Sequence, residues 1–318
     1  MARYEHLVAF ALEHPWAVMR SMMPVIAGVI AKHLAGEESD PQAIQAALVA
    51  RSNRMPTRSG QSRAGGAIVV IPIAGVLAPR MNLLSDTSGG TTFETLTSQL
   101  HAAVDDPRVT TIVFDVDSPG GNVAGATEFA REVREAATQK RIIAHAQHLM
   151  ASASYWPMSG ATQIIASPSA LVGSIGVYSL HDDISESLSK LGIKREIFTS
   201  GRYKGEGADG GPLSVEAKAH IQALVDTAGG RFRSDVAKGR GVSVPTVKDR
   251  FGEGRTFDAE SALRAGLVDR IATFTEILGE LAGSPAPVAL DDHRRALAAA
   301  SLASYRHQLD ALTIRRMQ

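Results

Sequence analysis

The chain has 318 residues, with 33 basic and 33 acidic side chains and no cysteine. This length allows one large domain with appendages, and the balanced charge gives no overall field that would attract nucleic acid or an acidic membrane surface. The absence of cysteine excludes disulfides, thiolate catalysis and thiolate metal sites, and it fits a reducing compartment such as the cytoplasm.

The N-terminal part is predicted to be an appendage rather than part of the core. Residues 1–51 carry apolar side chains at helical spacing and are expected to form a helical arm. The most apolar stretch, Met22 to Ala31, contains Pro24 and is much shorter than the ~20 residues that span a bilayer, so we expect no membrane span. Residues 52–66 are rich in Ser, Arg, Gly and Pro and are predicted to be a linker.

Residues 67–282 are predicted to form an α/β core. Short β-branched runs indicate buried strands, and they lie at Ala67 to Ala74, Thr110 to Val116 and Arg141 to Ala146. Helical patterns near Thr92 to Val104 and Val123 to Ala137 separate these runs. Such alternation is typical of crossover βα units around a mostly parallel sheet.

A long helix is expected from Ser214 to Arg240, because Ser214 is a suitable cap and Glu216 lies in the first turn. The segment Gly283 to Pro287 then breaks the chain. Residues 283–318 are rich in Ala, Leu and Arg and are predicted to be a helical or disordered tail that serves as a contact surface.

Two loops that follow strands carry the residues suited to chemistry. Asp117-Ser118-Pro119-Gly120-Gly121 lies between a strand and a helix, so its glycines can direct backbone amides at a ligand. Ala151-Ser152-Ala153-Ser154-Tyr155 follows the next strand. Because ligands of open α/β sheets bind beyond the carboxyl ends of the strands, we expect the two loops to form one site.

Ser152 and Lys204 are the candidate nucleophile and base. A serine hydroxyl is a weak nucleophile at neutral pH and needs a positioned base to accept its proton. A lysine can be that base once its ammonium group is desolvated. Lys204 lies in the segment Ser200-Gly201-Arg202-Tyr203-Lys204-Gly205.

These segments resemble the signatures of the signal peptide peptidase A family, peptidase family S49. The similar segments are Asp117 to Gly121, Ala151 to Tyr155, Val172-Gly173-Ser174-Ile175-Gly176-Val177, Ser200 to Lys204, and Gly254-Arg255 with Ala265-Gly266-Leu267-Val268-Asp269. They follow the family order and cover about Ala67 to Leu281. The resemblance implies a Clp-protease/crotonase-like fold with repeated ββα units.

The resemblance also implies roles for individual residues. Ser152 would be the nucleophile and Lys204 the general base. The amides of Gly121, Gly120 and Ala153 would hold the oxyanion, and the Ser174 hydroxyl would help to orient the lysine. The base must be neutral at rest, which requires a dry site without a close carboxylate, so the neighbouring Glu206 is expected to point away.

The chain differs from membrane-bound members of the family, which read Ala-Ser-Gly-Gly-Tyr and Lys-Asp where this chain has Ala153-Ser154 and Lys204-Gly205-Glu206. Its arm, core and tail resemble prophage head-maturation proteases of the lambda minor capsid protein C type. That likeness implies cleavage of scaffold and capsid proteins inside the assembling procapsid, in the host cytoplasm, by a homo-oligomeric ring in which protomers complete one another's sites. No cofactor or metal is implied.

Several other interpretations stay open. A histidine base is one, and His181 is the candidate because it lies four positions after Val177. His145 and His148 lack the helical His-Glu-x-x-His context of a metal hydrolase. The chain could instead be a cytoplasmic S49 peptidase that degrades signal peptides or other peptides, a crotonase-like acyl-CoA enzyme, or a non-catalytic capsid assembly protein.

The expected substrate is an extended peptide that pairs with a strand edge. The apolar side chains of Leu149, Met150 and Tyr155 beside the serine predict a preference for small or apolar residues at the cleaved bond.

Overall fold

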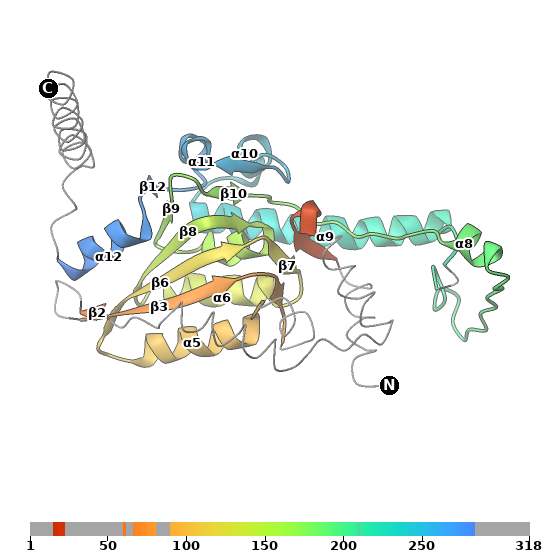
Figure 1. Cartoon of the computed structure of the whole chain (residues 1–318), viewed down its shortest axis with the longest axis horizontal. Helices are drawn as coiled ribbons and strands as arrows, with labels where there is room; N and C mark the ends of the chain where they lie inside the picture. The colour runs from red at the N-terminus through yellow and green to blue at the C-terminus, as the bar shows by residue number, and fades with distance from the viewer. Residues whose placement is uncertain (1–14, 23–59, 62–65, 81–89, 209, 284–318) are drawn as a thin grey trace, which may run out of the picture.

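A mostly parallel β-sheet lies at the centre of the protein, in a computed structural model that describes residues 15–22, 60–61, 66–80, 90–208 and 210–283 (Figure 1). The eight-stranded sheet has the order β11-β10-β8-β6-β3-β2, with β9 beside β8 and β12 beside β9. Its strands are β2 (Gly60–Gln61), β3 (Ala67–Ala74), β6 (Val109–Ser118), β8 (Arg141–Ala151), β9 (Gln163–Ala166), β10 (Leu171–Gly173), β11 (Thr256–Asp258) and β12 (Arg270–Ile271). The three strands predicted from β-branched runs are confirmed as β3, β6 and β8, which pair in parallel.

The residues at the edges of the predicted core differ from expectation. Gly60–Gln61 lies in the predicted linker but pairs antiparallel with the start of β3. The helical prediction for the arm is wrong at Trp16–Val18, which forms strand β1, and a 3-10 turn η1 follows at Arg20–Met22. The rest of the arm and the tail beyond residue 283 lie outside the described residues. Within the described ranges, no helix has the length and apolar composition needed to cross a bilayer.

A second, four-stranded sheet of order β1-β7-β4-β5 stands beside the carboxyl ends of the main strands. Its members are β1, β4 (Leu77–Ala78), β5 (Thr91–Thr92) and β7 (Gly120–Asn122). Strand β7 is the glycine loop that follows β6, and it pairs with β1 on one side and β4 on the other. The sequence pattern placed this loop at the site but did not predict that it is a strand.

Alternation along the central strands divides the buried apolar side chains between the two faces of the sheet. On β6, Ile112, Phe114 and Val116 join the larger core, whereas Val113 joins the smaller one. The larger core lies under α5 (Phe93–Asp105), α6 (Ala126–Ala136), α7 (Tyr155–Met158) and α9 (Val215–Arg240). The smaller core lies under α12 (Phe274–Ala282).

Helix ends follow the local sequence. The Thr92 hydroxyl accepts a hydrogen bond from Thr95 N at the start of α5, and Ser214 caps α9 in the same way, as predicted. Helix α6 begins at Ala126, three residues later than predicted, because Asn122 Oδ1 accepts from Ala124 N and Gly125 takes φ 89°. The remaining helices are α8 (Ser185–Lys190), α10 (Val244–Arg250) and α11 (Ala259–Ala265).

Helix α8 and the chain around it project from the rest of the molecule. Figure 1 shows α8 at the free end of the long helix α9, away from the central sheet. Residues 180–204 are exposed almost throughout. We call residues 180–208 and 210–213 the projection.

A buried charge cluster fastens α9 to the short helix α7. Trp156 Nε1 donates to Asp235 Oδ2 at 3.0 Å, and Arg134 lies 3.2 Å from the other carboxylate oxygen. The Trp156 ring stacks on Phe232 with centroids 4.3 Å apart. Asp235 is 6% exposed, and these partners compensate the free-energy cost of burying its carboxylate.

Replacing Asp235 with alanine should therefore destabilise the fold. Loss of the carboxylate leaves the indole N–H and the Arg134 guanidinium without their partner, and we expect the free energy of unfolding to fall by about 3 kcal/mol. Chemical denaturation measures this change. The control is Asp226→Ala on the same helix, where the exposed carboxylate accepts a hydrogen bond from Gln222 and the expected loss is within about 0.5 kcal/mol. Equal losses in the two variants would contradict the role of the cluster.

Candidate active site

Three neighbouring strands end at the same edge of the sheet and bring the predicted loops together. Ser118 at the end of β6 lies opposite Met150, and Gly173 at the end of β10 lies opposite Ala151. Because Ala151 and Gly173 are paired, the residues that follow them, Ser152 and Ser174, lie at the same edge of the sheet. The register between β6 and β8 is irregular just before this edge, because three residues of β8, 147–149, stand against the single residue Asp117 of β6.

Ser152 stands at a sharp turn between β8 and the helical turn η2 (Ser152–Ser154) that leads into α7. Its φ angle is 60°, the left-handed region that a residue with a side chain seldom adopts. Such strain persists only where the surrounding structure enforces it, and it gathers at functional sites. The side chain is 1% exposed, and its Oγ has no hydrogen-bond partner among the described residues.

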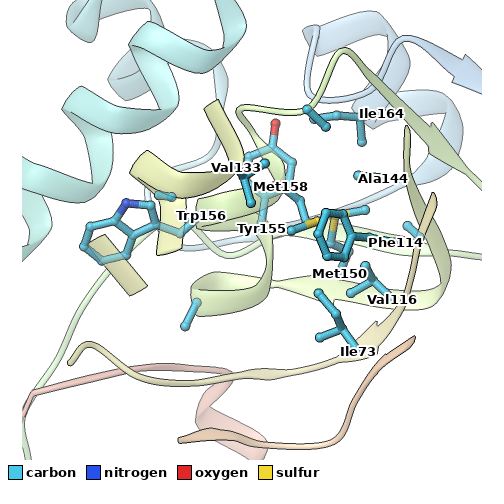
Figure 2. Close-up of a cluster of buried hydrophobic side chains, with 14 of the residues drawn as sticks. Ile73, Phe114, Val116, Val133, Ala144, Met150, Tyr155, Trp156, Met158 and Ile164 are labelled. Carbon is cyan, nitrogen blue, oxygen red and sulfur yellow. The ribbon is translucent and has the colours of Figure 1, made fainter. Parts of the chain in front are cut away.

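The residues after Ser152 hold this turn in place. Ser154 Oγ lies 3.1 Å from Ser118 O and 2.9 Å from Ala151 O, so one hydroxyl bridges the ends of β6 and β8. Tyr155 OH donates to Leu267 O at 2.8 Å. Figure 2 shows Tyr155 and Trp156 within the cluster of buried side chains around Phe114 and Met150. Burial raises the pKa of Tyr155, so this donor stays protonated.

Gly120 approaches the serine turn too closely to carry a side chain. A Cβ at this position would lie 2.9 Å from both Ala151 O and Ala153 N, and the φ angle is 98°. Ser118 holds the glycine in place, because its hydroxyl donates to Gly75 O and accepts from Gly120 N. The structure thus brings Gly120 beside Ala153, two of the three predicted amide donors.

Gly121, the third predicted donor, lies between two strands. It pairs with Ala17 of β1 and with Leu77 of β4, and a Cβ here would lie 2.0 Å from Leu77 O. Only glycine fits between backbones at this distance.

Ser174 resembles Ser152 in conformation and lies next to it in strand register. Its φ angle is 54°, and its amide donates to Arg255 O at 2.8 Å. Two left-handed serines therefore end adjacent strands at the same edge of the sheet.

Lys204 is the one predicted residue that the fold does not bring to this edge. It lies in the projection, exposed, within a turn where its amide donates to Gly201 O. Since Ser152 Oγ has no partner among the described residues, Lys204 does not contact it within one protomer. Glu206 is also exposed, in the same turn.

His145 and His181 form contacts with residues other than Ser152. His145 Nδ1 lies 2.9 Å from Asp115 Oδ1, and its Nε2 lies 3.0 Å from Ser167 Oγ. This Ser-His-Asp order occurs on the sheet face that α12 covers, where the His145 ring contacts Phe274, and not at Ser152. His181 Nε2 donates to Gly211 O within the projection. Among the described residues, no three His, Asp or Glu side chains gather as a metal site requires.

Two segments that lie at this edge were not predicted from the sequence. Trp16–Val18 pairs with β7, and Tyr178 pairs with Trp16 through two backbone hydrogen bonds of 2.9 and 3.0 Å. The sequence signal was the short Trp-Ala-Val run after Pro15, which fits a strand better than a helix.

Residues 134–285 match the family model of peptidase family S49. The chain is 30% identical over 211 residues to the capsid assembly protease C of Escherichia phage lambda, covering 66% of this chain and 48% of that protein. It is 28% identical to the head-tail preconnector protein GP5 of Enterobacteria phage P21, covering 68% of this chain and 42% of that protein. It is 31% identical to a putative signal peptide peptidase SppA of Enterococcus faecium, covering 67% of this chain and 62% of that protein. The chain spans about half of the length of the phage relatives.

Tyr178 gives this edge of the molecule a measurable alkaline sensitivity. Burial raises its pKa to about 12, and its hydroxyl has no partner among the described residues. In the unfolded chain the phenol ionises near pH 10. The native state then binds more protons than the unfolded state, so the stability contributed by Tyr178 is complete below about pH 10 and is lost as the pH rises towards 12.

Tyr178→Phe should accordingly show a shallower loss of stability than the original chain between about pH 9 and pH 12, because phenylalanine does not ionise. Denaturant titrations across this range measure the difference. Parallel curves for Tyr178→Phe and the original chain would contradict the prediction.

Proposed function

Residues 134–285 of this chain belong to peptidase family S49, and from this premise we propose that the protein is a serine endopeptidase with Ser152 as its nucleophile. The observation that supports the proposal best is the left-handed turn at Ser152, held next to Gly120 and the amide of Ala153 where three strands end. Acyl transfer requires a nucleophilic hydroxyl near backbone donors, and the closeness of Gly120 to the residue after Ser152 supports that assignment.

In the proposed reaction, Ser152 Oγ attacks the carbonyl carbon of a peptide bond and loses its proton to a base. Backbone amides from the glycine loop and from Ala153 stabilise the negative charge on the carbonyl oxygen. The base then delivers the proton to the leaving amine, which leaves an acyl group on Ser152. Water, activated by the same base, releases the acid and restores the serine.

We propose Lys204 as the base, supplied by a neighbouring protomer. A lysine acts as a base only when it is neutral, and neutrality requires a dry surrounding. Lys204 is exposed in the single chain, so another surface has to cover it before it can serve.

The projection has the surface of an interaction element. It exposes large apolar side chains, among them Phe198 at 91%, Leu191 at 72% and Ile193 at 50%. Exposed apolar surface of this kind marks contacts between proteins. A ring of identical subunits in which each projection reaches the next protomer would bury these side chains and carry Lys204 to a neighbour's serine edge.

The proposed substrates are phage scaffold or capsid proteins, processed during procapsid maturation in the host cytoplasm. The likeness to the lambda capsid assembly protease C supports this. The apolar neighbours of Ser152 in the sequence, Leu149, Met150 and Tyr155, are the basis for proposing small or apolar residues at the cleaved bond. A map of the cleavage products of a co-expressed scaffold tests both statements.

Labelling with a fluorophosphonate separates the proposed nucleophile from the buried Ser-His-Asp network. We expect Ser152→Ala to lose labelling and to cut peptide cleavage by about 10⁴-fold or more, because the attacking atom is gone. Ser167→Ala, which removes the serine beside His145, is the matched control and should retain both. Intact mass spectrometry of each variant shows whether it carries the label. Labelling lost from Ser167→Ala and retained by Ser152→Ala would move the nucleophile, and no labelling at all would favour a non-catalytic or acyl-CoA function.

Mixing two inactive variants tests the source of the base. Lys204→Ala should lower cleavage by about 10²-fold to 10⁴-fold, as expected for removal of a general base. Co-assembled with Ser152→Ala, it should regain partial activity, because some sites then combine an intact serine with an intact lysine of the neighbour. Lys194→Ala, an exposed lysine of the projection that pairs with Glu196, is the control and should stay active. Full activity of Lys204→Ala alone would exclude this lysine, and His181 would be tested next.

A further inference from the structure

Strand β1 lies between the two segments that border the serine edge. On one side, Trp16–Val18 pairs antiparallel with β7, the glycine loop. On the other side, Trp16 N donates to Tyr178 O and Tyr178 N donates to Trp16 O. An extended segment with backbone partners on both flanks has the geometry in which peptides are recognised by strand addition.

The hydrogen-bond pattern shows where the carbonyl of Ala17 points. Met19 N donates to Pro119 O, and Val123 N donates to Pro15 O. Because hydrogen-bonded pairs alternate along an antiparallel ladder, the pair between these two, Ala17 with Gly121, is also hydrogen-bonded. The Gly121 amide therefore donates to Ala17 O.

The Ala17 carbonyl and the amide that follows Ser152 approach the same point. A Cβ built on Gly120 would lie 2.3 Å from Ala17 O and 2.9 Å from Ala153 N. The Gly121 amide, one of the donors that the proposed function assigns to the oxyanion, is thus occupied by a carbonyl of the chain itself, and the Ala153 amide lies near the same point. The segment holds the position that the carbonyl of a substrate would occupy.

Strand β1 is buried against the turn that carries Ser152. Trp16, Ala17 and Val18 are exposed by 4%, 0% and 2%, and the strand lies against the turn η2 that carries the serine. A reactive hydroxyl has to be reached by substrate, yet Ser152 is 1% exposed. Removal of the strand would open this edge and free the backbone groups of Gly121 and Tyr178.

We infer that residues 15–19 occupy the peptide-binding groove of this protein as a built-in, substrate-like segment. The groove lies between Gly120–Asn122 and Tyr178, and its ligand class is an extended peptide with a small residue opposite Gly121. The inference rests on the proposed function. Peptide substrates compete with the segment for the same backbone groups, so the segment must leave before Ser152 can react with them.

A reversible disulfide tests the inference within one protein. Trp16 and Asn122 form a non-hydrogen-bonded antiparallel pair, whose Cα atoms lie about 4.5 Å apart, within the range a disulfide requires. The variant Trp16→Cys/Asn122→Cys can therefore be locked by oxidation and released by reductant. The original chain contains no cysteine, so no other disulfide forms within it.

We expect oxidation of this variant to lower peptide cleavage and fluorophosphonate labelling by about tenfold or more, and reduction to restore both. The control is Leu171→Cys/Asp258→Cys, a non-hydrogen-bonded pair of β10 and β11, which should be equally active in both states. Equal cleavage by the oxidised and reduced forms of the β1 variant would overturn the inference. Labelling of Ser152 in the reduced form separates this result from a failure of the proposed function, in which neither form would be labelled.

Hydrogen exchange on the unaltered chain tests the same inference without replacing Trp16, so its result does not depend on whether the cysteine variant folds. An extended peptidyl fluorophosphonate is attached to Ser152, and exchange of the amides of residues 16–18 is followed by mass spectrometry. We expect their protection to be lost on attachment, while protection of α9 is unchanged. Retained protection of these amides with the inhibitor bound would overturn the inference.

Discussion

The parallel register of β8 with β6 and β10 is the constraint on which the candidate site depends. Because Met150 lies opposite Ser118 and Ala151 lies opposite Gly173, the three strands end side by side. Each strand is followed by a different loop, and the shared edge makes those loops neighbours although they are far apart in the chain. A shift of one residue in this register would turn the buried side chains of β8 to the other face of the sheet.

The strain at this edge is held by contacts made further back in the core. Ser152 and Ser174 both take left-handed conformations, which cost free energy in residues with side chains. Short helix α7 resists relaxation because Tyr155 donates to Leu267 O and Trp156 donates to buried Asp235. The larger hydrophobic core and one buried carboxylate therefore fix the geometry of a turn whose own sequence is only small residues.

In the single chain the candidate nucleophile is buried and the candidate base lies elsewhere. Gly120 lies close to the Ala153 amide, and Ser174 follows the residue paired with Ala151, whereas Lys204 lies exposed in the projection. Strand β1 lies over the same edge and uses backbone groups that an extended peptide would use. For the proposed peptidase, both features would mean that activity requires contacts that the isolated chain does not make. Such an enzyme would be restrained until it assembles and meets its substrate.

Local sequence determined much of the core. The β-branched runs fixed β3, β6 and β8, the Ser214 cap fixed the start of α9, and the glycine and serine motifs identified the residues that meet at the sheet edge. These features depend on side-chain shape, periodicity and capping, which act over a few residues. Tertiary structure alone decided that Trp16–Val18 is a strand paired with β7, that His145 contacts Asp115 and Ser167, and that Lys204 does not contact Ser152 within the chain. A three-residue strand has little preference of its own, and its backbone groups take whichever partners the fold presents.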